Sequence, residues 1–465
     1  MLWGFILIVY TYLHQDYGNQ LVLSRLDLLH ALIRKGTFRI DDYQNTYDEA
    51  FAHGHYYCDK APGVAFLAVP SFYLSSQILR ETGVPLDSGG GWLVSSWMGT
   101  ACSVAPIAAL GCVFFYLSLL HFVSSRWAFL ATVVIAFGTM TFPYATALLS
   151  HGAVIGLISI ALWTLLPQCE ANPRPLTRYR PIVGGFASGL AVSCEFDAAL
   201  VAASVYILFC MRGRKAACLA ACGSAPPLSL IPAYNWISMG TPFSLPYAHE
   251  AVHYEMSAGL YGIHAPNVGA ALILLFSQHS GLFFWTPFLF LACFGYQDLY
   301  RRSPSLCLLC YVVPIMQVVV ISGNYNVSAG FTFGARYLSP IVPLLALPAG
   351  IGASKAPWLG VFSGVLSVVA TTGATIVNSM LIATTGSVLD YYRSEFRRGR
   401  IPHNLGAMLG LPPHWQMAPL IAFVAIGSYL LARRLGRSHP PADSLPISEK
   451  APMAWRTRFC ERPNE

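Results

Sequence analysis

Charged side chains are scarce in this sequence. Asp, Glu, Lys and Arg make up 11% of its 465 residues and 55% are hydrophobic, whereas soluble domains are about one quarter charged. The formal net charge of +7 is small and spread over the connecting segments, which argues against a nucleic-acid partner. The composition therefore leaves no room for a sizeable soluble domain and predicts a multi-pass membrane protein.

Other features are missing as well. The apolar N-terminus, 1–13, has neither a basic start nor a small-residue cleavage site, so we expect a first helix, clipped at its start, and no signal peptide. The one CxxC spacing, Cys307 to Cys310, has no second pair to complete a metal site. The sequence shows no internal repeat, which weakens a transporter reading built on inverted halves.

Long apolar runs are abundant. From runs of the length that crosses a bilayer we predict an all-α membrane bundle of about twelve transmembrane helices. The expected spans are 2–13, 92–120, 127–147, 149–168, 181–195, 197–211, 214–238, 280–299, 304–321, 336–352, 357–385 and 417–433. The run 64–79 is interrupted by Pro70 and is predicted to be interfacial. Residues 1–435 would form the membrane domain, and 436–465, rich in proline and charge, a disordered cytoplasmic tail.

The basic residues predict the orientation of the bundle. With the N-terminus inside, most short loops that carry Lys or Arg fall on the cytoplasmic side, as the positive-inside rule requires. The exception is the loop with Arg393, Arg397, Arg398 and Arg400. Either the topology is locally different there, or these arginines meet headgroups or an anionic substrate. The polar segments 14–63, 239–279, 322–335 and 386–416 would then share the outer face and enclose a cavity, and the apolar run 268–276 would be re-entrant or interfacial.

The segment 14–63, called the outer segment below, is polar. A protein this hydrophobic has no structural need for a polar segment of that length. A helix-like run, 18–35, places Leu21 and Leu28 on an apolar side and Arg25 and Asp27 on other sides, which predicts a helix lying on the membrane surface. Asp16 would lie at its N-terminal edge, where the helix dipole favours a carboxylate. A simple helix cap is the alternative for Asp16.

The outer segment ends in the string YYCDKAPG, residues 56–63. It contains the predicted substrate contacts Tyr57, Asp59 and Lys60, and Pro62 and Gly63 should end the extended segment and fix the lysine at the cavity mouth. An ammonium there is a compact partner for phosphate. A lysine that merely reaches headgroup water, beside an aromatic belt, is the alternative.

Four further candidates are expected near outer helix ends. His151, Glu195 and Arg336 carry ionisable groups at membrane depth, and Tyr234 precedes a loop rich in aromatic and polar residues. Such groups are costly in a membrane and are functional candidates by default. A guanidinium at Arg336 can hold a phosphate through two parallel hydrogen bonds. Structural roles, such as packing or a tight turn, stay open for each.

A metal site is the weaker possibility in the same loop. His249, Glu250 and His253 have a helix-compatible spacing for a metal ion, but the sequence offers no third ligand of known position. We therefore predict no certain cofactor and no metal ligands, with a divalent metal ion left open.

These residues together resemble the membrane-embedded GT-C glycosyltransferases, including family 39 mannosyltransferases and the aminoarabinose transferase of lipid A. The resemblance covers roughly residues 1–350. It is carried by the aspartate after the first helix, the string 56–63, the turn 234–242 and the segment 333–338. In place of the family's Asp-Glu pair this chain has Asp16 and Tyr17, so Asp48 competes for the role of base.

The resemblance implies a fold, a reaction and roles. Asp16 or Asp48 would be the general base on the acceptor, Lys60 and Arg336 would bind the phosphate of a polyprenyl-phosphate sugar, and Asp59 would orient Lys60. The acceptor would be a lipid, glycan or protein on the extracytoplasmic face, and a bacterial plasma membrane is the expected location. The alternative function is a transporter or flippase of lipid-linked sugars, which should carry its charges midway along the spans.

Overall fold

The computed structural model describes residues 1–15, 17–43, 45–166, 179–327, 330, 332–377, 380, 387–399 and 401–437. The chain divides into two compact units, Met1–Leu420 and Ile421–Glu465. The predicted tail from residue 438 onward lies outside the described residues, so the domain boundary at 435 stays a prediction.

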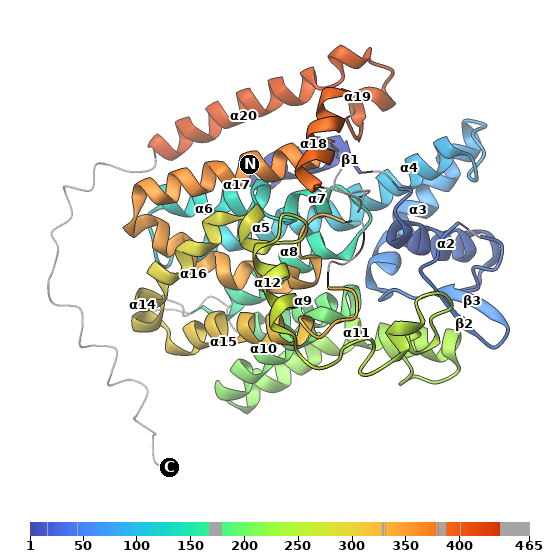
Figure 1. Cartoon of the computed structure of the whole chain (residues 1–465), viewed down its shortest axis with the longest axis horizontal. Helices are drawn as coiled ribbons and strands as arrows, with labels where there is room; N and C mark the ends of the chain where they lie inside the picture. Colours follow the sequence, from blue (N-terminus) through green and yellow to red (C-terminus); the bar gives the residue numbers. More distant parts are fainter. Residues whose placement is uncertain are drawn as a thin grey trace, which may run out of the picture. The chain divides into compact units, whose positions relative to one another are not determined.

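The protein is built almost entirely of helices (Figure 1). The helices are α1 (Leu2–Tyr12), α2 (Gln20–Lys35), α3 (Gly63–Glu81), α4 (Gly89–Gly99), α5 (Ala105–Leu119), α6 (Ser125–Phe137), α7 (Thr141–Ala145), α8 (Ser150–Leu165), α9 (Arg180–Cys194), α10 (Ala199–Met211), α11 (Arg214–Met239), α12 (Val268–Phe276), α13 (Leu282–Trp285), α14 (Ala292–Arg302), α15 (Pro304–Ile321), α16 (Val342–Lys355), α17 (Pro357–Val377), α18 (Val388–Arg397), α19 (Leu405–Met408) and α20 (Ala418–Arg437). The strands form two short antiparallel pairs, β1 (Leu13–His14) with β4 (His403–Asn404) and β2 (Glu49–Ala52) with β3 (His55–Cys58).

The helices confirm the all-α membrane fold. Among the described residues, six are long and apolar enough to cross a membrane: Gly89–Leu119, Arg214–Met239, Pro304–Ile321, Arg336–Lys355, Pro357–Val377 and Pro413–Leu431. Four shorter apolar helices add Leu2–Tyr12, Ser125–Phe137, Ser150–Leu165 and Phe196–Met211. The predicted total of about twelve spans stays a prediction.

Two expected spans are broken. The run 127–147 is divided between α6 and α7, and the run 280–299 between α13, a 3-10 helix and α14. Proline explains the second break, because Pro287 has no amide hydrogen to donate and begins the 3-10 helix. The predicted short helix at 268–276 is confirmed as α12.

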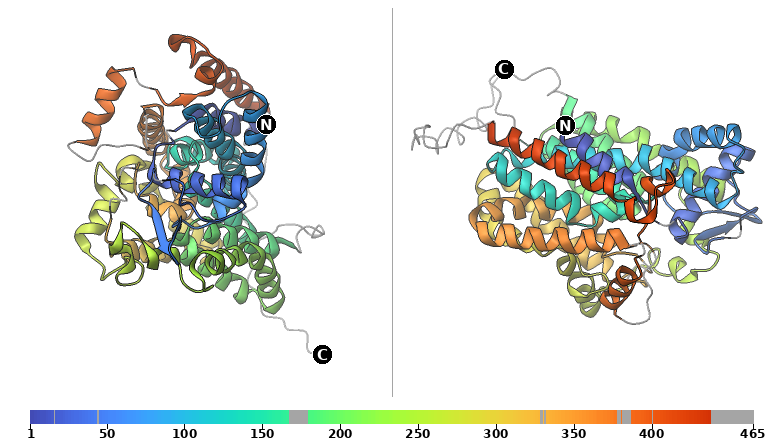
Figure 2. Two further views of the ribbon diagram at one scale, coloured as in Figure 1. Left: turned by 90° about the vertical axis from the view of Figure 1, so that its right-hand side faces the viewer. Right: turned by 90° about the horizontal axis from the view of Figure 1, so that it is seen from above.

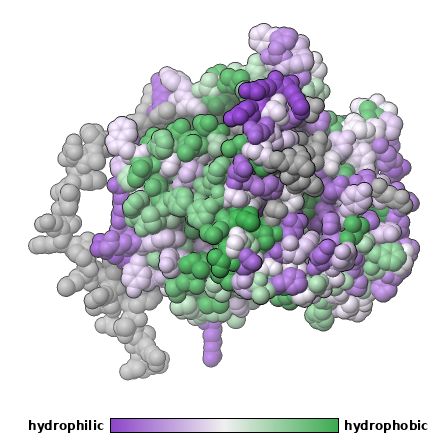
Figure 3. All heavy atoms as spheres, viewed as in Figure 1, coloured by the Kyte–Doolittle hydropathy of each residue, from purple (hydrophilic) through white to green (hydrophobic). Residues whose placement is uncertain are grey.

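Small residues bring the central helices together. A Cβ added to Gly111 of α5 would lie 2.1 Å from the Cα of Gly156 of α8, a distance that no packing tolerates. In a membrane, where the hydrophobic effect does not drive helices together, small residues let helix backbones approach closely, and van der Waals packing then stabilises the contact. The outward side chains are apolar, and green surface covers much of the face over α14, α15 and α17 (Figure 3).

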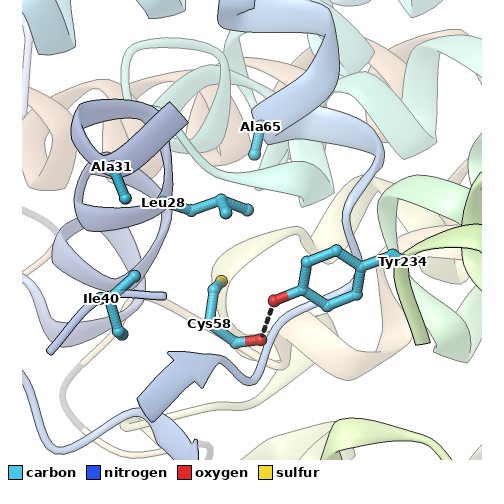
Figure 4. Packing of buried hydrophobic residues seen from close by; sticks show 6 residues of the cluster. All are labelled: Leu28, Ala31, Ile40, Cys58, Ala65 and Tyr234. Carbon is cyan, nitrogen blue, oxygen red and sulfur yellow. Dashed lines mark hydrogen bonds between the residues drawn. The ribbon is translucent and has the colours of Figure 1, made fainter. Parts of the chain in front are cut away.

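The outer segment forms a separate layer at one end of the helices. In Figures 1 and 2, α2, α3 and the β2–β3 hairpin lie together beside the loop that follows α11. A cluster of buried apolar residues joins them, shown in Figure 4 and made of Leu28, Ala31, Ile40, Cys58, Ala65 and Tyr234. The Tyr234 hydroxyl donates to the Cys58 carbonyl at 2.6 Å, so α11 is tied to the end of β3.

A close contact between α3 and α9 positions the segment just before α3. A Cβ on Gly63 would lie 2.6 Å from the backbone of Ser193. Glycine is therefore required where α3 begins, and its backbone meets the last two residues of α9, Ser193 and Cys194. This contact brings the segment around Lys60 next to the residue that follows α9, Glu195.

The prediction for the run 18–35 was right about the helix and wrong about two of its side chains. α2 begins at Gln20, with the Asn19 side chain accepting from the Leu21 amide. Arg34 and Lys35 are exposed, but Arg25 and Asp27 are buried, with 1% and 0% exposed. The physical reason is that α2 packs against α3, α4 and β3, so it is covered on more than its apolar side.

Candidate functional site

A cavity of about 350 Å³ lies between the outer segment and the helix ends. Five of the nine predicted site residues line it: Asp48, Lys60, His151, Glu195 and Arg336. They come from the approach to β2, the β3–α3 connection, the start of α8, the residue after α9 and the start of the 3-10 helix Arg336–Ile341. The fold therefore gathers into one site residues that are far apart in the sequence.

On one side of the cavity, Lys60 is surrounded by carboxyl groups. Its ammonium forms a salt bridge with Asp59 and lies 3.3 Å from Oδ1 of Asp48. The Glu250 carboxyl acts on the same ammonium. Nε2 of His253 lies 3.6 Å from Oδ1 of Asp48. We call Asp48, Asp59, Lys60 and Glu250 the lysine cluster.

Protonation in the lysine cluster follows from burial and proximity. Burial disfavours the charged form of Lys60, but the nearby carboxylates of Asp48 and Asp59 outweigh it and raise its pKa. Burial acts against ionised Asp59, but Lys60 outweighs it and lowers the pKa of that carboxyl. Burial, followed by the charge of Asp59, raises the pKa of Glu250 to about 11. Near neutral pH, Lys60 and Asp59 are therefore charged and Glu250 is protonated.

Local structure explains where Lys60 lies. β3 ends at Cys58, and α3 begins at Gly63 with Pro62 before it, which confirms that Pro62 and Gly63 end the extended segment. Ser24 of α2 donates to Oδ1 of Asp59 at 3.2 Å. Asp59, bound to both Ser24 and Lys60, connects the lysine to the buried side of α2.

On another side of the cavity, Arg336 is buried without enough partners. Its side chain lies over the Tyr337 ring, 5.1 Å from the centroid, and Nη2 donates to the Tyr337 hydroxyl at 3.3 Å. Nε and Nη1 have no hydrogen-bond partner within the described part of the chain. The residue is 7% exposed. A buried guanidinium with two unpartnered nitrogens is a ready site for an anion with two oxygens.

Glu195 and His151 form a third side. Oε2 of Glu195 accepts from the Ser150 hydroxyl and lies 4.0 Å from Nδ1 of His151. The same His151 nitrogen is 3.2 Å from the Ser339 hydroxyl. Both residues are at helix ends, because His151 is the second residue of α8 and Glu195 follows α9.

Three other predicted residues do not line the cavity. Tyr57 packs against Ala50 and Met239 in a second buried cluster. Tyr234 bonds the Cys58 carbonyl, and Asp59 lies behind Lys60, fully buried. These contacts hold the hairpin and the lysine in place. The ninth predicted residue, Asp16, lies outside the described residues.

The candidate metal ligands have different partners. Nε2 of His249 is 2.8 Å from the Ser244 hydroxyl. Glu250 belongs to the lysine cluster, and His253 lies beside Asp48 of that cluster. No group of three His, Cys, Asp or Glu in the described residues could hold a metal ion. The Lys60 ammonium already occupies the place between the carboxyls, so these residues do not fit a metal.

Three tyrosines of the cavity were not among the predicted site residues: Tyr247, Tyr325 and Tyr337. His253, considered in the sequence only as a metal ligand, also lines the cavity. They come from the segments 239–279 and 322–335, together with the residue after Arg336. Both segments were expected on the outer face, and the loop that contains Tyr247 was visibly rich in aromatic and polar residues.

No family model and no curated protein matches the chain. Among solved structures, ArnT from Cupriavidus metallidurans in the apo state has a TM-score of 0.50 at 15% identity, covering 92% of this chain and 73% of ArnT. ArnT bound to undecaprenyl phosphate gives 0.47 at 13%, covering 93% and 71%. The oligosaccharyltransferase of Archaeoglobus fulgidus tethered with an acceptor peptide gives 0.45 at 10%, covering 80% and 55%. The likeness to apo ArnT shows the fold alone: the chain has an ArnT-like, all-helical membrane fold.

Proposed function

We propose that this protein is a membrane glycosyltransferase that moves a sugar from a polyprenyl-phosphate donor to an acceptor on the extracytoplasmic face. The observation that carries the proposal is Arg336, a buried cation with two nitrogens that lack a partner among the described residues, on the wall of a cavity that also contains carboxylates. The GT-C fold supports it. ArnT, which has this fold, binds undecaprenyl phosphate in its second structure.

The proposed reaction divides the work between the sides of the cavity. The bond between the sugar C1 and the phosphate oxygen breaks, and the polyprenyl phosphate leaves with the electron pair. Arg336 binds the leaving phosphate and stabilises the charge that develops on it. The acceptor hydroxyl oxygen forms the new bond to C1 and loses its proton to a carboxylate.

Asp48 is the proposed base. It is the carboxyl of the lysine cluster that lines the cavity, and its Oδ1 lies 3.3 Å from the Lys60 ammonium. Asp16, which the family resemblance also suggests, remains the rival for this role. Lys60 acts mainly on the carboxylates that surround it and contributes a positive charge to the phosphate from behind Asp48.

The transporter alternative is less well supported. A carrier of lipid-linked sugars should have its charges midway along the spans. Here His151 and Glu195 are at helix ends, and Asp48 and Lys60 are in connecting segments. Charges gathered at one end of the helices fit chemistry at the membrane surface.

The test is sugar transfer from a radiolabelled polyprenyl-phosphate donor pool, in membranes with matched expression of wild type, Arg336→Met and Arg214→Met. Arg214 is an exposed arginine remote from the cavity lining and serves as the control. We expect transfer with wild type and the control, and its loss with Arg336→Met. If wild type transfers nothing from any donor while lipid-linked sugar still crosses vesicles, the transporter reading replaces this one.

A further inference from the structure

Arg25 is the largest fully buried side chain in the described residues. It comes from the outer helix α2, where the sequence placed it on a side other than the apolar one. Nη1 donates to the Leu21 carbonyl at 2.8 Å, and Nη2 lies 3.4 Å from the Ser150 hydroxyl and 4.0 Å from Oε2 of Glu195. Its Nε has no partner within the described residues. A guanidinium so deeply buried is retained at a large desolvation cost.

The contacts of Glu195 all converge on one oxygen. Oε2 receives the Ser150 hydroxyl, the Arg25 guanidinium and the nearby His151 ring. None of these contacts uses Oε1. Because Glu195 lines the cavity, the carboxylate is held by one oxygen and can offer the other to a ligand.

Arg25 faces a mixed set of charges around Glu195. The groups packed near this carboxyl from other elements are His151 of α8, Asp197 of the following 3-10 helix, Tyr247 of the loop after α11 and Arg336. Of the two arginines, Arg25 is the nearer to Glu195, with Nη2 4.0 Å from Oε2. Removing Arg25 would therefore take away the nearest positive charge.

The charge of the Glu195 carboxylate limits which ligand groups it can bind. It repels a phosphate, so it cannot contact the phosphate that Arg336 binds. It accepts hydrogen bonds well, and hydroxyl groups are the donors that a sugar presents. His151 and Tyr247 add one nitrogen and one hydroxyl on the same wall.

We propose that Arg25 is a positioning residue that holds the Glu195 carboxyl through Oε2, and that Glu195 accepts hydrogen bonds from hydroxyls of the donor sugar; the second half rests on the proposed function. The cavity then has a cationic side for phosphate and a carboxylate side for the sugar. The outer helix α2 reaches through Arg25 into the sugar side and sets its geometry.

The first test needs no activity. Dicyclohexylcarbodiimide takes up the proton of a protonated carboxyl in apolar surroundings and becomes bonded to the carboxylate as an O-acylisourea, which rearranges to a stable N-acylurea. Mass spectrometry of the purified full chain would follow modification of Glu195 in wild type, Arg25→Met, Arg25→Lys and Arg34→Met. Arg34, on the same helix but exposed and paired with Asp87, is the control.

We expect Arg25→Met to label Glu195 about tenfold faster than wild type, and Arg25→Lys to lie between the two, as a retained charge requires. Arg34→Met should match wild type. Equal labelling in wild type and Arg25→Met would overturn the positioning role. Labelling that rises at every carboxyl of Arg25→Met would show loss of fold and would also contradict it.

The second test uses binding and transfer. Glu195→Gln should raise the KM for the sugar-bearing donor about tenfold, the value of one hydrogen bond to a charged group, while binding of sugar-free undecaprenyl phosphate stays unchanged. Arg25→Met combined with Glu195→Gln should be no worse than Glu195→Gln alone. Weakened binding of undecaprenyl phosphate by Glu195→Gln would contradict the sugar role. If wild type transfers nothing, the proposed function fails, and the labelling result still decides the role of Arg25.

Discussion

The two cations of the cavity, Lys60 and Arg336, differ in what surrounds them. Lys60 has a salt bridge with Asp59, a carboxylate oxygen of Asp48 at 3.3 Å and the Glu250 carboxyl. Arg336 has a tyrosine hydroxyl and a ring, with two of its three nitrogens unused among the described residues. Both are buried and both line the same cavity.

The sequence suggested phosphate binding for both residues. Their different surroundings indicate a structural role for Lys60 and a phosphate-binding role for Arg336. A buried charge with all its partners present contributes to structure, and removing one partner is costly because the others are left uncompensated. A buried charge with unused donors costs stability and gains from a ligand. Lys60 is thus expected to stabilise the outer segment, and Arg336 to bind the phosphate.

The largest effect is expected from Asp48→Asn. Loss of a general base lowers kcat by about 10²–10⁴-fold, while donor binding stays close to that of wild type. Asp59→Asn is the matched control, since Asp59 contacts the same ammonium but does not line the cavity. Transfer assays with both variants measure it. Full activity of Asp48→Asn would assign the base to Asp16 and would remove the catalytic function from the lysine cluster.

Next in size is Lys60→Met, a change in stability. It leaves Asp59 and Asp48 buried without their cation, and breaking a buried pair costs about 3–5 kcal/mol. Thermal unfolding in detergent should show a lower Tm, with partial recovery when Asp59→Asn is added. A Tm equal to that of wild type would mean that the lysine is as free for phosphate as Arg336.

Arg336→Met should act in the opposite way. Loss of its two donors should weaken binding of undecaprenyl phosphate by about 100-fold, a value between one and two charge-assisted hydrogen bonds. Arg336→Lys should recover only part, because an ammonium cannot form the two parallel bonds. Its Tm should stay near that of wild type or rise. A large fall in Tm with unchanged lipid binding would reverse the comparison between the two cations.

The smallest effect concerns Asp27, a buried carboxyl of the outer segment outside the cavity lining. Burial, with Asn45 opposing and Glu49 adding to it, raises its pKa from 3.8 to about 8. Because the pKa of Asp27 is higher in the folded than in the unfolded chain, its contribution to stability is greatest below the unfolded pKa. That contribution is lost as pH rises toward 8. The variant Asp27→Asn does not titrate, so its unfolding free energy should gain on that of wild type as pH rises. The difference between variant and wild type should be about 1–3 kcal/mol larger at pH 9 than at pH 6. Parallel unfolding curves at both pH values would contradict it.

The sequence predicted the helices of the bundle well because each one corresponds to a continuous apolar run that can be recognised locally. A run such as 304–321 is apolar over its whole length, and the structure has α15 at Pro304–Ile321. Glycine and proline also act locally, which is why the turn at Pro62 and Gly63 could be predicted. Where a proline begins a 3-10 helix, as at Pro287, the run of apolar residues hid the break.

The site was harder to predict because burial is decided by tertiary packing. Arg25 and Arg34 are both arginines of α2, and only the layers around the helix make one buried and the other exposed. Likewise the tyrosines were visible in the sequence, but Tyr234 supports the hairpin while Tyr247 lines the cavity. Residue type indicated polar chemistry at this end of the bundle, and spacing could not tell which side chains reach it.

The buried position of Arg25 has a consequence for biosynthesis. Its partner Glu195 is synthesised 170 residues later, which at about 5–20 residues per second takes roughly 10–30 s. Tyr234, Glu250 and Arg336 follow later still. The outer segment is therefore made early, and the Arg25 guanidinium lacks its partner until synthesis has passed Glu195. Completion of the site is a late event in the life of the nascent chain, although its first residues are among the earliest made.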